Sequence, residues 1–345
     1  MKIGVLVNDV AHERSSYTTV ALMRAARRHA HRVFVIGVGD FVHEAGHVAA
    51  WAREAPDAGA SPEAFVEALR ASAVARVAVD ELDVLLLRNN PYDDLEERPW
   101  AAQAGLVFGE EAKRRGVLVL NDPNGLAHAL NKLYLERFPA ALRPASVVTR
   151  HADDVREFAD RHGTIVVKPL NGSGGRGVFI VRPEDDANFN QILEAVGAHG
   201  YVVAQEYVPE AREGDVRLLL LNGRPLEKNG KIAAMGRVSA KGDLRHNVRA
   251  GGSVKPVNVS AAMLELAELA RPRLIEDGMF LVGLDIVGSD ARCKVLEINV
   301  FSPGGMVSAS AFSGVDYAAV LVEDLERKVA HASHDHFDNR LLACL

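Results

Sequence analysis

The segment TIVVKPLNGSGGRG, residues 164–177, joins a short apolar strand to a loop that holds four glycines in its last seven residues. Without a Cβ at those positions, backbone N–H groups can turn toward phosphate oxygens. The loop is not a P-loop, because that motif ends in lysine and a hydroxyl residue at the start of a helix, and here the apolar run VFIV follows. The segment therefore predicts a phosphate-binding loop between two strands, with a flexible hairpin tip as the alternative.

Two lysines lie where they can serve the same phosphates. Lys168 directly follows the apolar strand 165–167, so its ammonium group can extend past the end of the strand. Lys132 lies 36 residues earlier, in the helix predicted over 126–138, and could supply a second positive charge. Either lysine alone is more often a surface charge. In combination with the glycine loop, they predict a nucleotide phosphate site.

Three oxygen-bearing side chains interrupt apolar strands near the C-terminal end. They are Asp285 in LDI, residues 284–286, and Glu297 and Asn299 in LEIN, residues 296–299. Residues two apart face one side of a strand, and Asp285 can lie across from them on a neighbouring strand. Burial of such groups is costly unless a positive charge compensates, and hard oxygen ligands suit Mg²⁺, or Mn²⁺ in its place. A buried salt-bridge network is the alternative.

A basic, glycine-containing segment, residues 235–252, runs between these groups and has few apolar anchors, which predicts a mobile loop that closes over the site. Arg237 in this segment and Arg217 in the preceding GDVR are the candidates for stabilising an acyl phosphate or a tetrahedral oxyanion, because a guanidinium fork matches paired oxygens. Ordinary surface arginines are the alternative.

The order of apolar runs predicts an α/β protein of three units and a tail. Residues 1–121 alternate short strands with helices and resemble a small Rossmann-like domain, although no GxGxxG follows a strand. Ser16 and Ser61-Pro62 mark helix starts within it. Residues 122–204 open with a helix over 126–138 and form an α+β lid, residues 205–330 form a strand-rich α+β unit closed by a helix over 317–329, and residues 331–345 form a solvated tail.

Composition narrows the class of protein. The chain has 345 residues, 48% of them hydrophobic and 25% charged, with a net charge of −6, so it carries no excess positive charge to attract nucleic acid or an anionic membrane. Two cysteines are too few for a disulfide framework, and the apolar run after Lys2 is too short for a signal peptide. We therefore expect a cytoplasmic protein with small-molecule partners, and neither nucleic acid nor membrane among them.

A rival class comes from residues 43–47, which read His-Glu-Ala-Gly-His and match HExxH, the zinc-binding helix of metalloproteases. Gly46 weakens a helix there, and short matches arise easily in a chain with 13 histidines. Histidines of the tail, His331, His334 and His336, are a further metal-binding candidate, with a solvated end as the alternative. A nucleotide-binding protein without catalysis is a third class, but it predicts loss of the lysines or metal ligands, and these are present.

Taken together, the motifs resemble the ordered series of ATP-grasp ligases, and among them most closely the bacterial glutathione synthetases. The resemblance covers nearly the whole chain, in the order KIGVLVNDV, LLLRNNPYD, LVLNDPNGLAHALNKLYLERF, TIVVKPLNGSGG, AQEYVPEAREGDVRLLLLNG, VRAGG, FLVGLDIVG and EINVFSP. It implies an ATP-grasp fold with a Rossmann-like N-terminal domain. It also implies a ligase that activates a carboxylate as an acyl phosphate and joins it to an amine, and a homo-oligomer, dimer or tetramer.

The resemblance also implies roles for individual residues. By this resemblance Arg217 and Arg237 would be catalytic, and Asp285, Glu297 and Asn299 would bind Mg²⁺. ATP binding falls to Lys132, Lys168, Gly172, Ser173, Gly174, Gly175, Gly177, Gln205, Glu206, Tyr207, Val208 and Asp215. Substrate binding falls to Arg88, Asn247, Ser302, Gly304 and Gly305.

The sequence departs from that family after Ser302-Pro303. It continues Gly304-Gly305-Met306-Val307-Ser308, where glutathione synthetases typically carry a threonine and an arginine-bearing helix start that help to bind γ-glutamylcysteine. Residues 233–237 also resemble part of the ligases that add glutamate to a ribosomal protein's tail. A ligase for a different amino acid or peptide pair is therefore the alternative.

Overall fold

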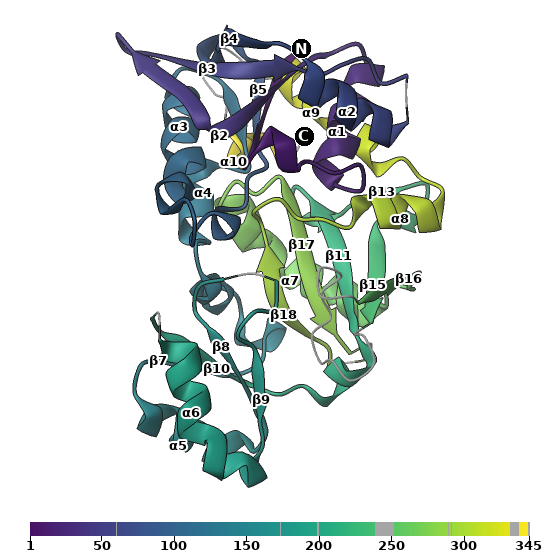
Figure 1. The fold of residues 1–345 in the computed structure, drawn as a ribbon. Helices are drawn as coiled ribbons and strands as arrows, with labels where there is room; N and C mark the ends of the chain where they lie inside the picture. Colours follow the sequence, from purple (N-terminus) through teal and green to yellow (C-terminus); the bar gives the residue numbers. More distant parts are fainter. Residues whose placement is uncertain are drawn as a thin grey trace.

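The computed structural model describes residues 1–59, 61–172, 174–198, 200–238, 252–288, 290, 292–331 and 338–343. Within them the chain builds three main sheets with helices packed on them (Figure 1). The first sheet lies at the top of the view with both chain ends, the third is in the middle, and the second extends below. The predicted α/β class with a Rossmann-like first unit is confirmed.

The first sheet has the strand order β4-β3-β2-β1-β5-β6, in which β2, β1, β5 and β6 run parallel and β3 and β4 are antiparallel additions. The parallel strands are nearly continuous apolar runs because helices cover them. Ser61 caps α2 as predicted, accepting a hydrogen bond from the Ala64 amide. The elements are β1 Lys2–Val7, α1 Thr18–Arg28, β2 Arg32–Glu44, β3 His47–Glu54, α2 Pro62–Ala71, β4 Val74–Ala78, β5 Val84–Leu87, α3 Ala104–Arg114 and β6 Leu118–Leu120.

The HExxH match of residues 43–47 lies in a β-hairpin. His43 and Glu44 end β2, His47 begins β3, and Ala45 and Gly46 turn the chain with φ of 50° and 81°. Two histidines bind zinc in this motif only when a helix places them on one face. The metalloprotease interpretation is therefore wrong, and His47 instead contacts Asp80, with 3.1 Å between Nδ1 and Oδ2.

The second sheet forms the lid, with the antiparallel order β7-β10-β8-β9. Val155 and Phe158 of α5 and Phe189 of α6 share its separate core. The chain enters and leaves the lid side by side, because the Glu206 amide donates a 2.9 Å hydrogen bond to the Ala145 carbonyl. The elements are β7 Ser146–Thr149, α5 Ala152–His162, β8 Ile165–Pro169, β9 Phe179–Val181, α6 Asp186–Gly197 and β10 Val202–Glu206, so the domain limit predicted at residue 204 falls within β10.

The third sheet has the antiparallel order β16-β15-β11-β17-β18, and β12 pairs with β11 beside it. Helix α9 leaves this unit and packs on α1, where Tyr317 and Leu321 join the core of the first sheet. The elements are β11 Asp215–Leu221, β12 Arg224–Pro225, the ribbon β13 Glu227–Lys228 with β14 Lys231–Ile232, β15 Ala234–Val238, β16 Ser253–Lys255, α7 Ala261–Glu276, β17 Leu281–Val287, β18 Lys294–Asn299, α8 Met306–Ser313, α9 Tyr317–His331 and α10 Asn339–Leu342.

The helix predicted over 126–138 is wrong. The chain forms a short helix, α4 Pro123–His128, and then a 3-10 helix over Lys132–Arg137. Between them Asn131 is extended and its side chain accepts a hydrogen bond from the Leu133 amide. The Lys132 amide donates to the Leu170 carbonyl of the lid instead of continuing a helix.

The first and third sheets are joined through the buried side chain of Asn121. Its Nδ2 donates to the carbonyls of Leu281 and Val300, and its Oδ1 accepts from the amides of Phe280 and Leu281. Four bonds satisfy the whole amide, which favours one arrangement of the two units.

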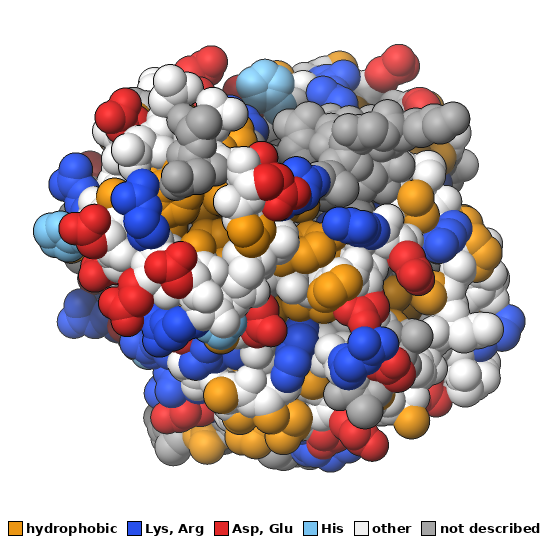
Figure 2. All heavy atoms as spheres, turned by 90° about the horizontal axis from the view of Figure 1, so that it is seen from below, with side chains coloured by type: hydrophobic (Ala, Val, Ile, Leu, Met, Phe, Trp, Pro, Cys, Tyr) orange, Lys and Arg blue, Asp and Glu red, His pale blue; other side chains and the backbone are white. Residues whose placement is uncertain are grey.

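The outer surface is mixed in charge. Figure 2 shows acidic and basic side chains interspersed over the face seen from below, with hydrophobic side chains between them. Among the described residues, no helix combines the length and apolar character needed to cross a membrane.

Candidate active site

A cavity of about 1050 Å³ lies where the three units meet. The lid supplies one wall, strands β11, β15, β17 and β18 another, and the loops after β1 and β5 of the first sheet a third. The structure brings most of the predicted site residues to its lining: Arg88, Lys132, Lys168, Gly172, Gly174, Gly175, Gln205, Glu206, Tyr207, Val208, Asp215, Arg217, Arg237, Asp285, Glu297, Asn299, Ser302, Gly304 and Gly305.

Three predicted residues do not appear in this lining. Gly177 packs against Pro169, where an added Cβ would lie 3.3 Å from the proline Cδ. Its φ of 68° still requires glycine, so its role is to shape the loop. Ser173 and Asn247 lie outside the described residues, as do His334 and His336 and most of the loop predicted over 235–252.

The two lysines meet at the end of β8, as predicted. Lys168 donates to Gln205 Oε1 at 3.0 Å, and Lys132 donates to the carbonyls of Pro169 at 3.0 Å and Gly172 at 2.9 Å. Burial and the neighbouring Lys132 charge lower the pKa of Lys168 to about 8. Burial also lowers the pKa of Lys132. Two partly buried ammonium groups that have no anionic partner in bonding distance among the described residues are well suited to bind phosphate.

Four charged side chains form a compact cluster on strands β11, β15 and β17. Cross-strand register places Arg217 opposite Asp285 and Asp215 opposite Arg237. Both arginines bind Asp285, with 2.8 Å from Arg217 Nη2 and 2.7 Å from Arg237 Nη2, and Arg237 Nε also donates to Asp215 at 2.7 Å. Burial alone would raise the pKa of Asp285, but the charges of the two arginines outweigh it and hold it at about 2.

Glu297 differs from this cluster although it lies beside it. It faces Asp285 across β17 and β18, and in the described part of the chain its carboxylate has no hydrogen bond or ion pair. Asn299 on the same strand donates to Asp285 Oδ2 at 3.1 Å. An unpartnered carboxylate, with an amide and a second carboxylate beside it, fits the oxygen ligands that Mg²⁺ prefers. The salt-bridge alternative also holds in part, because Asp285 is paired with arginines.

A smaller hollow of about 80 Å³ adjoins the lysines. Its apolar lining comes from both sides of the site, with Val148 and Val203 from the lid and Leu296 and Ile298 from β18. An aromatic ring with a few polar edges suits such a slot. These four residues carry no functional signal in the sequence, since isolated apolar residues in strands usually belong to a core.

The opposite end of the cavity is built by the first sheet and the loop after β18. Arg88 is 8% exposed and donates to Thr19 Oγ1 at 3.3 Å and to the Pro303 carbonyl at 3.1 Å. Burial lowers its pKa to about 10. Gly305, with φ of 107°, precedes α8, whose first amide, that of Met306, donates to Thr18.

Glu13 is a further residue of this end of the cavity that was not predicted from the sequence. It follows the 3-10 helix Val10–His12, lines the same end of the cavity and is 7% exposed. Its Oε2 has no hydrogen-bond partner among the described residues. Burial raises the pKa of Glu13 to about 7, although the charges of Arg88 and Arg70 act in the opposite direction. No local pattern in the sequence marks this glutamate, because its burial comes from tertiary contacts.

The matches to known families cover this whole arrangement. Residues 1–127 match the family model of the prokaryotic glutathione synthetase N-terminal domain, and residues 131–314 match that of its ATP-grasp domain. The chain belongs to the prokaryotic glutathione synthetase family. As a member of this family it is an ATP-dependent ligase, which confirms the resemblance drawn from the motifs.

Relatives of the family align along nearly the full chain. The glutathione synthetase of Gloeobacter violaceus is 36% identical over 320 residues, covering 91% of this chain and 93% of its own. The glutathione synthetase of Vibrio cholerae is 31% identical over 332 residues, covering 95% of this chain and 98% of its own. These identities over nearly the full length place both matched domains, and not one alone, in the glutathione synthetase family.

Solved structures share the fold at lower identity. D-cycloserine synthetase DcsG has a TM-score of 0.63 at 18% identity, covering 94% of this chain and 99% of its own. D-alanyl-alanine synthetase A of Vibrio cholerae has a TM-score of 0.58 at 12% identity, covering 96% of this chain and 99% of its own. These likenesses establish the ATP-grasp fold, while the glutathione synthetase family rests on sequence.

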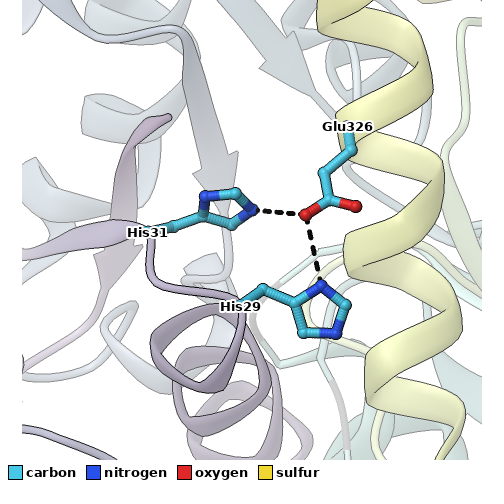
Figure 3. A group of neighbouring side chains, drawn as sticks. All are labelled: His29, His31 and Glu326. Carbon is cyan, nitrogen blue, oxygen red and sulfur yellow. Dashed lines mark hydrogen bonds and ion pairs between the residues drawn. The ribbon is translucent and has the colours of Figure 1, made fainter.

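A second group of ligand-type side chains lies away from the cavity, between α1 and α9 (Figure 3). Glu326 Oε1 lies 2.8 Å from His31 Nε2 and 3.2 Å from His29 Nδ1. The Met1 amine lies 3.2 Å from His31 Nδ1. Because both nitrogens of His31 already have partners, we regard this group as a link between the first sheet and α9.

Proposed function

We propose that the chain is a glutathione synthetase, which joins γ-glutamylcysteine to glycine and converts ATP to ADP and phosphate. The single observation that supports this most is the convergence in one cavity of a lysine pair, an unpartnered carboxylate and an arginine pair. Each set of groups matches one part of a carboxylate-to-amine ligation. The relatives aligned over the whole chain are named glutathione synthetase, which supports the same substrate pair.

The nucleotide would lie at the lid end of the cavity. Its adenine would occupy the apolar hollow beside the chain segment from Gln205 to Val208, and Asp215 would lie near the ribose. The ammonium groups of Lys132 and Lys168 would bind the phosphates under the loop 172–177, where glycines leave backbone amides free to approach oxygens. Binding would thus hold the lid against the third sheet.

Glu297, Asn299 and Asp285 would hold Mg²⁺. The ion would offset the charge of the phosphate oxygens when bound. Asp285 has a second task, because it holds the guanidinium groups of Arg217 and Arg237 in place through charge-assisted hydrogen bonds. The arginines therefore face the site in fixed positions before substrate arrives.

The chemistry would proceed in two steps. The cysteinyl carboxylate attacks the γ-phosphorus and ADP leaves, which gives an acyl phosphate. The glycine amine then attacks the carbonyl carbon, phosphate leaves with the bonding electron pair, and the amine loses a proton. Arg217 and Arg237 would stabilise the phosphoryl and tetrahedral oxyanions in these steps, and fixed donors of this kind contribute strongly because they need no reorganisation.

Phosphate release measured with ATP, γ-glutamylcysteine and glycine tests this proposal. We expect release that requires both substrates, with glutathione as the product by mass spectrometry. Release no greater than with ATP alone would overturn it.

A second candidate, ligation of a different amino acid or peptide pair, follows from the loop after Pro303. A Cβ at Gly304 would meet no atom of the described chain within 4 Å, so this part of the cavity is more open than a threonine there would leave it. A panel of amino acids and dipeptides in the same assay distinguishes the candidates. Cytoplasmic location and a homo-oligomeric state stay predictions from sequence and family.

A further inference from the structure

Glu13 is a buried acid whose carboxylate pairs with no side chain among the described residues. Glu13 lines the end of the cavity built by the first sheet and the loop after β18, and its Oε2 is enclosed without a hydrogen bond from any described residue. The backbone at Glu13 is fixed, because its carbonyl accepts a 2.6 Å hydrogen bond from Arg70 Nη2. Leaving a buried carboxyl oxygen unsatisfied is unfavourable, so a group from a ligand is the natural partner.

Arg88 is a buried cation in the same part of the cavity. It bonds only to neutral oxygens, those of Thr19 and Pro303, and in the described chain neither Glu13 nor Arg88 takes part in an ion pair. Opposite charges thus stand near each other without neutralising each other by direct contact. A ligand that carries both an ammonium and a carboxylate group would give Glu13 and Arg88 each a partner of opposite charge.

We propose that Glu13 binds the α-ammonium group, and Arg88 the α-carboxylate, of a zwitterionic amino acid moiety at the end of the substrate remote from the reacting carboxylate. Both residues belong to the first unit, whereas the arginines that face the reaction, Arg217 and Arg237, belong to the third sheet. The inference rests on the proposed function, since the γ-glutamyl end of γ-glutamylcysteine is such a moiety. Binding of the ammonium group by Glu13 would make the enzyme select substrates with an α-amino group, which binding of the carboxylate by Arg88 alone does not do.

A pair of substrates that differ only in the amino group tests this assignment. γ-Glutamylcysteine carries the α-amino group, and N-glutarylcysteine lacks it. We expect wild-type protein to prefer the first by about 10- to 100-fold in kcat/KM, mostly through KM, as for a charged hydrogen bond in a buried site. Equal kcat/KM for the two compounds would overturn the proposal without any variant.

Glu13→Gln should remove that preference, because the amide keeps the shape but loses the charge that binds the ammonium. Glu157→Gln is the matched control, since Glu157 is exposed on α5 outside the cavity and should keep the wild-type ratio. If Glu13→Gln retains the wild-type ratio, Glu13 does not bind the ammonium and the proposal is wrong. Circular dichroism checks that both variants are folded.

A failure of the proposed function itself would give a different result from a failure of the Glu13 assignment. In that case wild-type protein releases no phosphate with γ-glutamylcysteine and glycine, and a dipeptide panel identifies the accepted substrate. The same comparison is then made between that substrate and its analogue without the amino group. A loss of about tenfold or more in wild type that disappears in Glu13→Gln supports the role of Glu13, and no loss overturns it.

Discussion

Asp285 and Glu297 lie directly opposite each other on the antiparallel strands β17 and β18, but only Asp285 is paired with arginines. Two carboxylates on one face of a sheet repel each other unless a positive charge lies between or beside them. Arg217 and Arg237 supply this positive charge for Asp285. The Glu297 carboxylate pairs with no described residue, and we propose that it binds a cation.

Replacing Glu297 with glutamine should abolish turnover while the protein stays folded. The amide keeps the size of the side chain but loses the charge that would hold Mg²⁺, so we expect kcat to fall by at least about 10²-fold. Phosphate release at saturating ATP and Mg²⁺ measures this, and thermal unfolding is the control. A fully active variant would contradict the metal assignment.

ATP affinity should weaken as pH rises through about 8. The pKa of Lys168 is lowered to about 8 in the ligand-free site, so its ammonium loses its proton above that pH, whereas bound phosphate favours the protonated form. The dissociation constant should then rise by at most about tenfold per pH unit. Calorimetric titration between pH 7 and 9.5 tests this, and Lys168→Met should bind ATP weakly with no such dependence.

Glu13→Gln should stabilise the ligand-free protein at pH 8 but not at pH 4. The pKa of Glu13 rises from 4.5 to about 7 on folding, so folded protein holds this proton between those values and its stability falls as pH rises through them. The variant has no such loss and should gain up to about 3 kcal/mol above pH 7. Urea unfolding at both pH values measures the difference, and an equal effect at the two would disagree with the burial of Glu13.

The two glycines after Pro303 should respond differently to alanine. Gly305 has φ of 107°, and its added Cβ would lie 2.7 Å from Met235 Cε, whereas a Cβ at Gly304 meets nothing within 4 Å. We expect Gly305→Ala to cost about 1–3 kcal/mol of unfolding free energy and Gly304→Ala to be close to neutral. Thermal unfolding compares the pair directly, and similar losses in both would argue against strain at Gly305.

Features with a local physical cause were predictable from sequence. Buried parallel strands show as apolar runs, four glycines mark a loop that needs unusual backbone angles, and a spacing of two puts Glu297 and Asn299 on one face of β18. The capping of α2 by Ser61 is equally local. These features sufficed for the fold class and for the glycine loop, the lysine pair and the oxygen ligands of the candidate site, whereas other site residues, such as Arg88, came from the family resemblance.

Features that depend on distant contacts were not predictable. The pattern over 126–138 is helical in isolation, but the Leu170 carbonyl of the lid accepts the Lys132 amide and the helix breaks. Strand register decides that both arginines bind Asp285. The burial of Glu13 likewise depends on residues far along the chain, among them Arg70, whose Nη2 donates to the Glu13 carbonyl.

The paired entry and exit of the lid have a consequence for protein engineering. Because one hydrogen bond joins the chain where it enters at Ala145 and leaves at Glu206, and the segment between has its own core, we expect this segment to be exchangeable as a cassette. A chimera that takes this cassette from another nucleotide-dependent relative needs only two adjacent junctions. The proposed adenine site would then change on its lid side alone, since Leu296 and Ile298 of β18 line the same hollow from outside the cassette.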